Sequence, residues 1–158
     1  MPVQPTVFLI GLFFFVLAGC ASTPQASSAP PGDAGAAEQA ALHAAELVGK
    51  PYRYGGNQPA TGFDCSGLVQ YSYAKAGRKL PRSTDEQRAA SLRIRVSELR
   101  RGDLIFFDQD GKKHGHVGIY IGNGEFVHAP SSGKRVRRDR LDAPYWSRHI
   151  SEVRRPRA

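Results

Sequence analysis

The chain has 158 residues, enough for one compact domain with short appendages but too few for two full-sized domains. Apolar residues make up 41% and charged residues 23%, which excludes a wholly disordered chain and a collagen-like repeat. The 22 Lys and Arg residues outnumber the 14 Asp and Glu residues, giving a formal net charge of +8 at pH 7. We therefore expect anionic partners, although charge alone does not choose among nucleic acid, acidic lipid and a carboxylate-bearing polymer.

The N-terminus has the features of an export signal. Residues 7–18 form an apolar run of 12 residues, whereas a membrane-spanning helix needs roughly 20. The run leads into Leu17-Ala18-Gly19-Cys20, which resembles the lipobox of bacterial lipoproteins. This resemblance implies a signal peptide over 1–19, lipidation at Cys20 and membrane attachment through the N-terminal lipid. An ordinary cleaved signal and a short buried helix are the alternatives.

A tether is predicted between the lipidated cysteine and the folded domain. Residues 22–35 are rich in Ser, Ala, Pro and Gly and lack apolar periodicity, so residues 20–35 should form a lipidated, disordered linker. Ala21, rather than Asp, follows Cys20. In Gram-negative lipoproteins this resembles the outer-membrane sorting pattern. We therefore expect a lipid-anchored protein of the cell envelope, on the outer membrane facing the periplasm if the host is Gram-negative, with its domain over 36–158.

Helical patterns occupy the first half of this domain. Apolar residues at helical spacing predict a helix over 36–48. Asp64 is placed to cap a second helix, which puts Cys65 in its first turn. Ser83 and Glu86 have capping-box spacing and predict a third, short helix through about residue 91.

Strand patterns follow Gly102, where β-branched and aromatic runs alternate with Gly, Asp and Asn turns. The predicted strands are 104–107, 116–121 and 125–129, with 134–138 and 149–154 as two further candidates. Because the helices precede the strands, the pattern predicts an α+β domain in which N-terminal helices pack on an antiparallel β-sheet.

A hairpin is predicted around residues 122–124, which read as a three-residue loop with its last glycine at positive φ. This loop would place Ile121 opposite Glu125 and Gly118 opposite His128. A loop of two or four residues would instead place residue 119 opposite His128 and turn that histidine to the other face.

Cys65 is the candidate nucleophile. A helix N-terminus favours an anion, so we expect a stabilised thiolate, and Gly67 is expected to leave space beside the sulfur. A cysteine nucleophile needs an imidazole to take its proton and a third polar group to orient that imidazole. His116 and His128 meet this need because the predicted register makes them diagonal neighbours on one face, opposite the apolar residues Val117 and Ile119.

Several spaced motifs resemble the NlpC family of bacterial cell-wall cysteine peptidases, and within it the lipoprotein murein endopeptidases. They are Pro51-Tyr52-Arg53-Tyr54-Gly55-Gly56, Phe63-Asp64-Cys65-Ser66-Gly67-Leu68-Val69, Leu80-Pro81-Arg82-Ser83-Thr84, Gly102-Asp103-Leu104, Gly115-His116-Val117-Gly118-Ile119-Tyr120 and Phe126-Val127-His128-Ala129. The resemblance covers roughly Ala40 to the C-terminus and includes Pro144-Tyr145-Trp146.

The resemblance implies a papain-like fold and an enzyme that hydrolyses amide bonds of peptidoglycan stem peptides or of their cross-links. It implies that Cys65 is the nucleophile, His116 the base and His128 the orienting third residue. It also implies that Tyr52 lines the active site and that Asp64 and Ser66 bind the amino end of the substrate. We expect a monomer that uses no cofactor and no metal. Which stem-peptide bond is cut stays open.

Three other interpretations compete with this one. His114, His116 and His128 with Cys65 could be zinc ligands of a metallopeptidase, although neither a closely spaced Cys pair nor an H-E-x-x-H helix accompanies them. A lipid-anchored cell-wall-binding scaffold could have kept the fold and lost the activity. Nucleic-acid binding would suit the arginine-rich C-terminal runs, but an exported protein does not meet that partner.

Overall fold

The computed structural model describes residues 1–2, 33–131 and 133–157. The predicted signal peptide, the lipidation site Cys20 and most of the predicted tether lie outside these residues. Helix α1 begins at Asp33, so the last three residues assigned to the tether, 33–35, are helical. Over the described residues no helix has the length and apolar character needed to cross a bilayer.

The helices lie mainly before the strands, as predicted. The helical elements are α1 (Asp33–Glu46), α2 (Cys65–Lys75), α3 (Thr84–Ala89), the 3₁₀ helix η1 (Val96–Glu98) and α4 (Pro144–His149). The strands are β1 (Asn57–Gln58), β2 (Gly62–Phe63), β3 (Ser91–Ile94), β4 (Leu104–Gln109), β5 (Lys112–Gly122), β6 (Glu125–His128), β7 (Arg137–Arg140) and β8 (Ile150–Pro156). Strands β3 to β8 form a sheet of order β3-β8-β4-β5-β6-β7, with antiparallel neighbours throughout. The fold is an α+β domain of the papain-like class.

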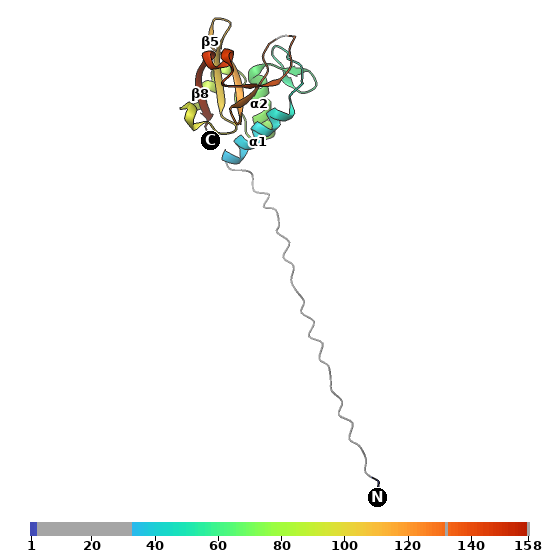
Figure 1. Ribbon diagram of the computed structural model, residues 1–158. Coiled ribbons are helices and arrows are strands. Elements are labelled where there is room, and N and C mark those ends of the chain that lie inside the picture. Colours follow the sequence, from blue (N-terminus) through green and yellow to red (C-terminus); the bar gives the residue numbers. More distant parts are fainter. Residues whose placement is uncertain (3–32, 132, 158) are drawn as a thin grey trace.

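The sheet is covered on both faces. Helices α1 and α2 lie on one side of it and the short helix α4 on the other (Figure 1). Val117 and Ile119 of β5 belong to the apolar cluster that includes α1 and α2, as their alternation predicted. Phe107, Phe126 and Trp146 form a second cluster on the opposite face. The histidine face of β5 is therefore a buried face rather than a solvated one.

The β5–β6 hairpin has the predicted register but a different tip. Ile119 pairs with Val127 and Tyr120 with Phe126, as expected from placing residue 118 opposite His128. The prediction of a three-residue loop was wrong, because Glu125 pairs with Gly122 and the turn has only two residues, 123 and 124, both at positive φ. The register shift between Tyr120 and Gly122 leaves residue 121 as the extra residue of a β-bulge. The two-residue turn and the one bulged residue together provide the three unpaired residues that the predicted register requires.

Two further elements differ from the predictions. Helix α4 was not predicted, although Pro144 occupies the first helical turn, where proline is favoured. Helix α3 ends at Ala89 because Ser91 already pairs with Pro156 as the first residue of β3. The end of α3 thus depends on pairing with β8, which is distant in sequence.

Candidate active site

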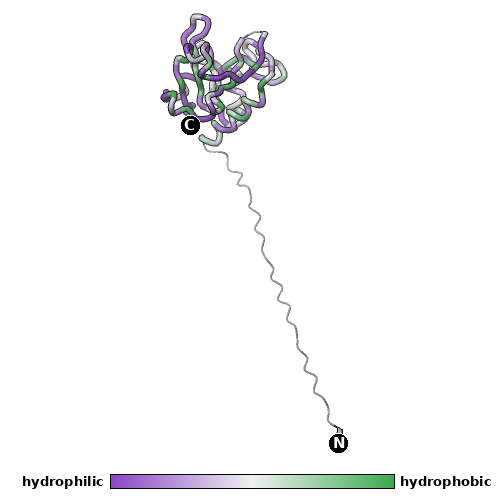
Figure 2. The backbone as a smooth tube through the Cα atoms, in the orientation of Figure 1, coloured by the Kyte–Doolittle hydropathy of each residue, from purple (hydrophilic) through white to green (hydrophobic). Residues whose placement is uncertain are grey.

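An open groove of about 570 Å³ contains the candidate nucleophile. Its lining includes Tyr52, Tyr54, Asp64, Cys65, Ser66, Arg82, Thr84, Lys112, Lys113 and His114. These residues come from the loop before β1, the start of α2, the segment around α3 and the β4–β5 hairpin. The hairpin end, at the top of the view in Figure 2, is hydrophilic and contributes two lysines to the groove.

Asp64 starts helix α2 and fixes the position of Cys65. Its backbone is extended, and its Oδ1 accepts a hydrogen bond from the Gly67 N–H at 2.6 Å, as an N-cap requires. The expectation that Gly67 leaves space beside the sulfur was wrong. A Cβ at Gly67 would overlap the carbonyl oxygen of Gly56, so the glycine permits a close backbone approach instead.

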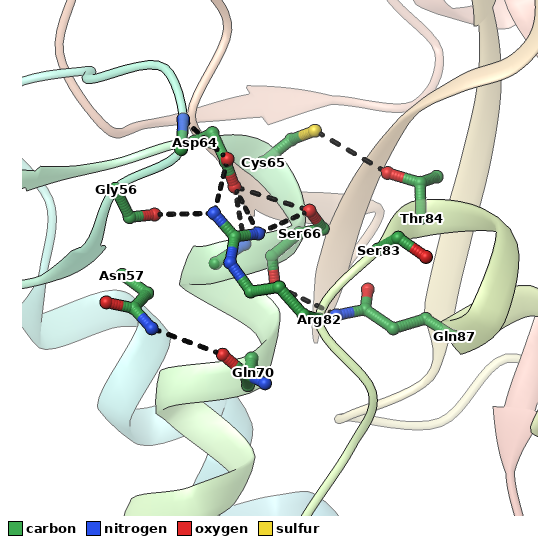
Figure 3. Close-up of polar contacts among 12 residues, drawn as sticks. Gly56, Asn57, Asp64, Cys65, Ser66, Gln70, Arg82, Ser83, Thr84 and Gln87 are labelled. Carbon is green, nitrogen blue, oxygen red and sulfur yellow. Dashed lines mark hydrogen bonds and ion pairs between the residues drawn. The ribbon is translucent and has the colours of Figure 1, made fainter.

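Arg82 joins the two side chains that flank the cysteine (Figure 3). It donates to both carboxylate oxygens of Asp64, at 3.0 and 2.5 Å, and to the Ser66 Oγ at 2.9 Å. It also reaches the Gly56 carbonyl oxygen at 3.3 Å. The sequence pattern gave Arg82 no role, although it lies in the Leu80-Pro81-Arg82-Ser83-Thr84 motif. An arginine is suited to this position because its planar guanidinium binds a carboxylate through two parallel bonds.

The Cys65 thiol is held between α2, α3 and β5. Its Sγ accepts hydrogen bonds from the backbone N–H groups of Val117 and Ser66, and it lies 3.9 Å from the Thr84 Oγ1. Burial raises the pKa of the Cys65 thiol, and the nearby Asp64 carboxylate raises it further, outweighing these hydrogen bonds. The raised pKa runs against the expectation of a stabilised thiolate, because burial is the largest influence on this thiol.

His116 and His128 lie together on the face that the register predicted. The Nε2 of His116 is 2.8 Å from the Nδ1 of His128, and both rings are buried. Burial, together with the neighbouring His128, lowers the pKa of His116 to about 3. His116 is consequently neutral near pH 7 and has a lone pair available. The Val117 N–H lies at the Cys65 sulfur, so the thiol meets β5 at the residue that follows His116.

The predicted substrate-binding residues share the same groove. Tyr52 faces it, and burial followed by the nearby Cys65 and Asp64 raises the pKa of its phenol. Asp64 and Ser66 are already hydrogen-bonded to Arg82, so an incoming amine would share the carboxylate with that guanidinium. The geometry brings all three predicted residues to one place and adds Arg82 to them.

The alternative zinc ligands are not arranged as a metal site. Within residues 1–2, 33–131 and 133–157, no group of three or more His, Cys, Asp or Glu side chains has the spacing to hold a metal ion. His114 makes a different contact, since its Nδ1 lies 2.7 Å from the Ser151 Oγ on β8.

The fold and the groove place this domain in the papain-like α+β class. Residues 49–155 match the NlpC/P60 family, and this match covers more than half of the chain. The chain belongs to the NlpC/P60 family.

Curated relatives and solved structures agree with this assignment. The chain is 44% identical over 115 residues to the murein DD-endopeptidase MepH of Escherichia coli (strain K12), covering 70% of this chain and 42% of MepH. It is 47% identical over 109 residues to the bifunctional muramidase/DL-endopeptidase CwlT of Bacillus subtilis (strain 168), covering 68% of this chain and 32% of CwlT. The chain therefore spans less than half the length of either relative. A crystal structure of a lipoprotein-like NLP/P60 family protein from Staphylococcus aureus matches with a TM-score of 0.69 at 35% identity, over 85% of this chain and 45% of that one.

Proposed function

We propose that this protein is a peptidoglycan endopeptidase that hydrolyses amide bonds of stem peptides or their cross-links through Cys65, His116 and His128. One observation carries the proposal. The Cys65 sulfur accepts the N–H of Val117, next to His116, whose ring is hydrogen-bonded to His128 at 2.8 Å. This combination of thiol, neutral imidazole and orienting group is what nucleophilic cysteine catalysis requires.

The proposed reaction begins from a neutral pair. His116 takes the thiol proton as the Cys65 sulfur attacks the stem-peptide carbonyl, because burial disfavours a free thiolate. Backbone N–H groups at the start of α2 stabilise the oxyanion. His116 then protonates the leaving amine, and water hydrolyses the thioester to release the acid and restore the thiol.

Substrate recognition is proposed to use both ends of the groove. Tyr52, Asp64 and Ser66 bind the amino end of the stem peptide, with Arg82 holding the carboxylate of Asp64 in place. Lys112 and Lys113 line the same groove and complement the carboxylates that stem peptides carry. MepH is named a DD-endopeptidase and CwlT a DL-endopeptidase, so both kinds of bond are candidates here.

Digestion of purified, cross-linked peptidoglycan with mass identification of the products tests this proposal. We expect cleavage by the wild type and loss of cleavage in Cys65→Ala, while the Cys20→Ala variant, which removes the other cysteine, keeps full activity. Activity should survive EDTA, because the nucleophile is a thiol and not a metal-bound water. Loss of cleavage with EDTA and its return with zinc would overturn the cysteine mechanism, and no cleavage under any condition would favour the scaffold.

We propose that the protein is a monomer anchored in the cell envelope by lipid on Cys20, with residues 20–35 as the connecting segment. The lipobox-like sequence supports this location. Cell fractionation tests it: the exported Cys20→Ala protein should be recovered in the soluble fraction, and continued membrane association would contradict the lipid anchor.

A further inference from the structure

His128 is hydrogen-bonded through both of its ring nitrogens. Its Nδ1 faces His116 at 2.8 Å, and its Nε2 lies 2.9 Å from the Oδ2 of Asp139 on β7. In the β6–β7 ladder His128 pairs with Arg137 and Phe126 with Asp139, which makes His128 and Asp139 diagonal neighbours on one face. The side chains of His116, His128 and Asp139 therefore form a hydrogen-bonded series across strands β5, β6 and β7.

Asp139 can only accept hydrogen bonds in this hydrogen-bonded series. Its Oδ2 also receives the indole N–H of Trp146 at 2.9 Å and the Nε–H of Arg137 at 2.9 Å, and both of these groups are donors only. Burial alone would raise the pKa of Asp139, but hydrogen bonds and charge from His128 and Arg137 hold it below its ordinary value. The carboxylate is therefore ionised near pH 7.

An ionised Asp139 decides where the protons of both histidines lie. The Nε2 of His128 must donate to the carboxylate, so in neutral His128 the Nδ1 has the lone pair. The Nε2 of His116 must then donate to that Nδ1, and the lone pair of His116 lies on its own Nδ1. We propose that Asp139 is a positioning residue that sets the tautomers of His128 and His116 and makes the Nδ1 of His116 the basic atom of the site.

Helix α4 packs against the hydrogen-bonded side chains through Trp146. The Trp146 ring stacks on His116, with centroids 5.9 Å apart and planes at 24°, and meets the His128 ring edge-on at 4.7 Å. Trp146 is buried, and its indole N–H donates to the same Asp139 oxygen that His128 contacts. When His116 takes a proton, the Asp139 charge is also available, through His128, to stabilise the resulting imidazolium.

Nitrogen-15 spectra of the histidine-labelled full chain test the assignment directly. The chain has only five histidines, and each signal can be assigned by replacing one of them. In the wild type, both His116 and His128 should be protonated at Nε2 and unprotonated at Nδ1. In Asp139→Ala the proton of His128 is no longer confined to Nε2, and the nitrogen shifts of both rings should move towards the tautomer average. Protonation of either wild-type ring at Nδ1, or shifts unchanged in Asp139→Ala, would overturn the inference.

Kinetics give a second readout, and this one rests on the proposed function. We expect Asp139→Ala to lower kcat about 10- to 100-fold with KM within about twofold, because the carboxylate acts through His128 and does not contact substrate. Asp139→Glu should recover part of the loss, and Asp142→Ala, which removes an exposed partner of Arg140, should match the wild type. A loss confined to KM would contradict a positioning role. A wild type with the stated tautomers but no hydrolysis would leave the inference standing and overturn the proposed function.

Discussion

The helix that holds the candidate nucleophile and the sheet that holds the two histidines are built in different ways. On the helix side, Cys65 follows its own N-cap, Asp64, and Arg82 holds the Asp64 carboxylate. On the sheet side, His116, His128 and Asp139 come from three strands and meet only after the strands pair. The helix side is rich in charge and open to solvent, whereas the two histidines are buried and neutral.

The difference shows how the two reacting groups are controlled. The backbone position of Cys65 depends on the N-cap at Asp64, a local hydrogen bond that forms with the helix. The protonation state of the base depends on burial and on long-range contacts, which form only in the complete domain. Changes on the sheet side should therefore act on chemistry, and changes on the helix side on geometry and stability.

Replacement of the base should have the largest effect. We expect His116→Ala to lower kcat by about 10²- to 10⁴-fold, the range for loss of a general base, with the fold retained. The control is His43→Ala on α1, which removes a histidine paired with Glu46 outside the groove. Initial rates on purified peptidoglycan measure the effect. An initial rate of His116→Ala within about threefold of the wild-type rate would contradict the role of His116 as the base.

Overpacking on the helix side should cost stability as well as activity. We expect Gly67→Ala to destabilise the domain by about 1–3 kcal/mol, because its Cβ would displace the Gly56 carbonyl that lies under α2. Gly77→Ala at the other end of the helix meets open space and should cost only about 1 kcal/mol, from its positive φ of 81°. Urea unfolding of both variants measures the difference. An equal loss of unfolding free energy in the two variants would show that the close approach of Gly67 to the Gly56 carbonyl does not contribute to stability.

Acidification should weaken the sheet side. The pKa of His116 in the folded protein, about 3, lies below its ordinary value of 6.5. Between these two pH values His116 is protonated in the unfolded chain and neutral in the folded protein. The free energy of unfolding should therefore fall as the pH falls from about 6.5, by about 1.4 kcal/mol per pH unit for each such histidine. Unfolding curves between pH 7 and pH 5 measure the slope, because the lowered pKa values of Asp139 and Glu152 act mainly at lower pH. A slope in His116→Gln equal to that of wild type would contradict the buried neutral base.

Local features were predictable from the sequence because short-range interactions decide them. The cap at Asp64, the helix that follows it and the capping box at Ser83 were all predicted and are present. The alternation in β5 and the predicted register place His116 and His128 on one face, and their contact is present, although a bulge rather than the loop provides the odd residue that this register needs.

Only the tertiary structure decided the remaining features of the site. The pairing of Arg82 with Asp64 spans 18 residues, and the bond from Trp146 to Asp139 depends on a helix that packs on the far face of the sheet. The sequence alone determined which groups are nucleophile and base candidates, because residue type and spacing decide that. It could not determine their protonation, because the pKa of Cys65 and of His116 is set mainly by desolvation, and burial exists only once helices and sheet have packed together.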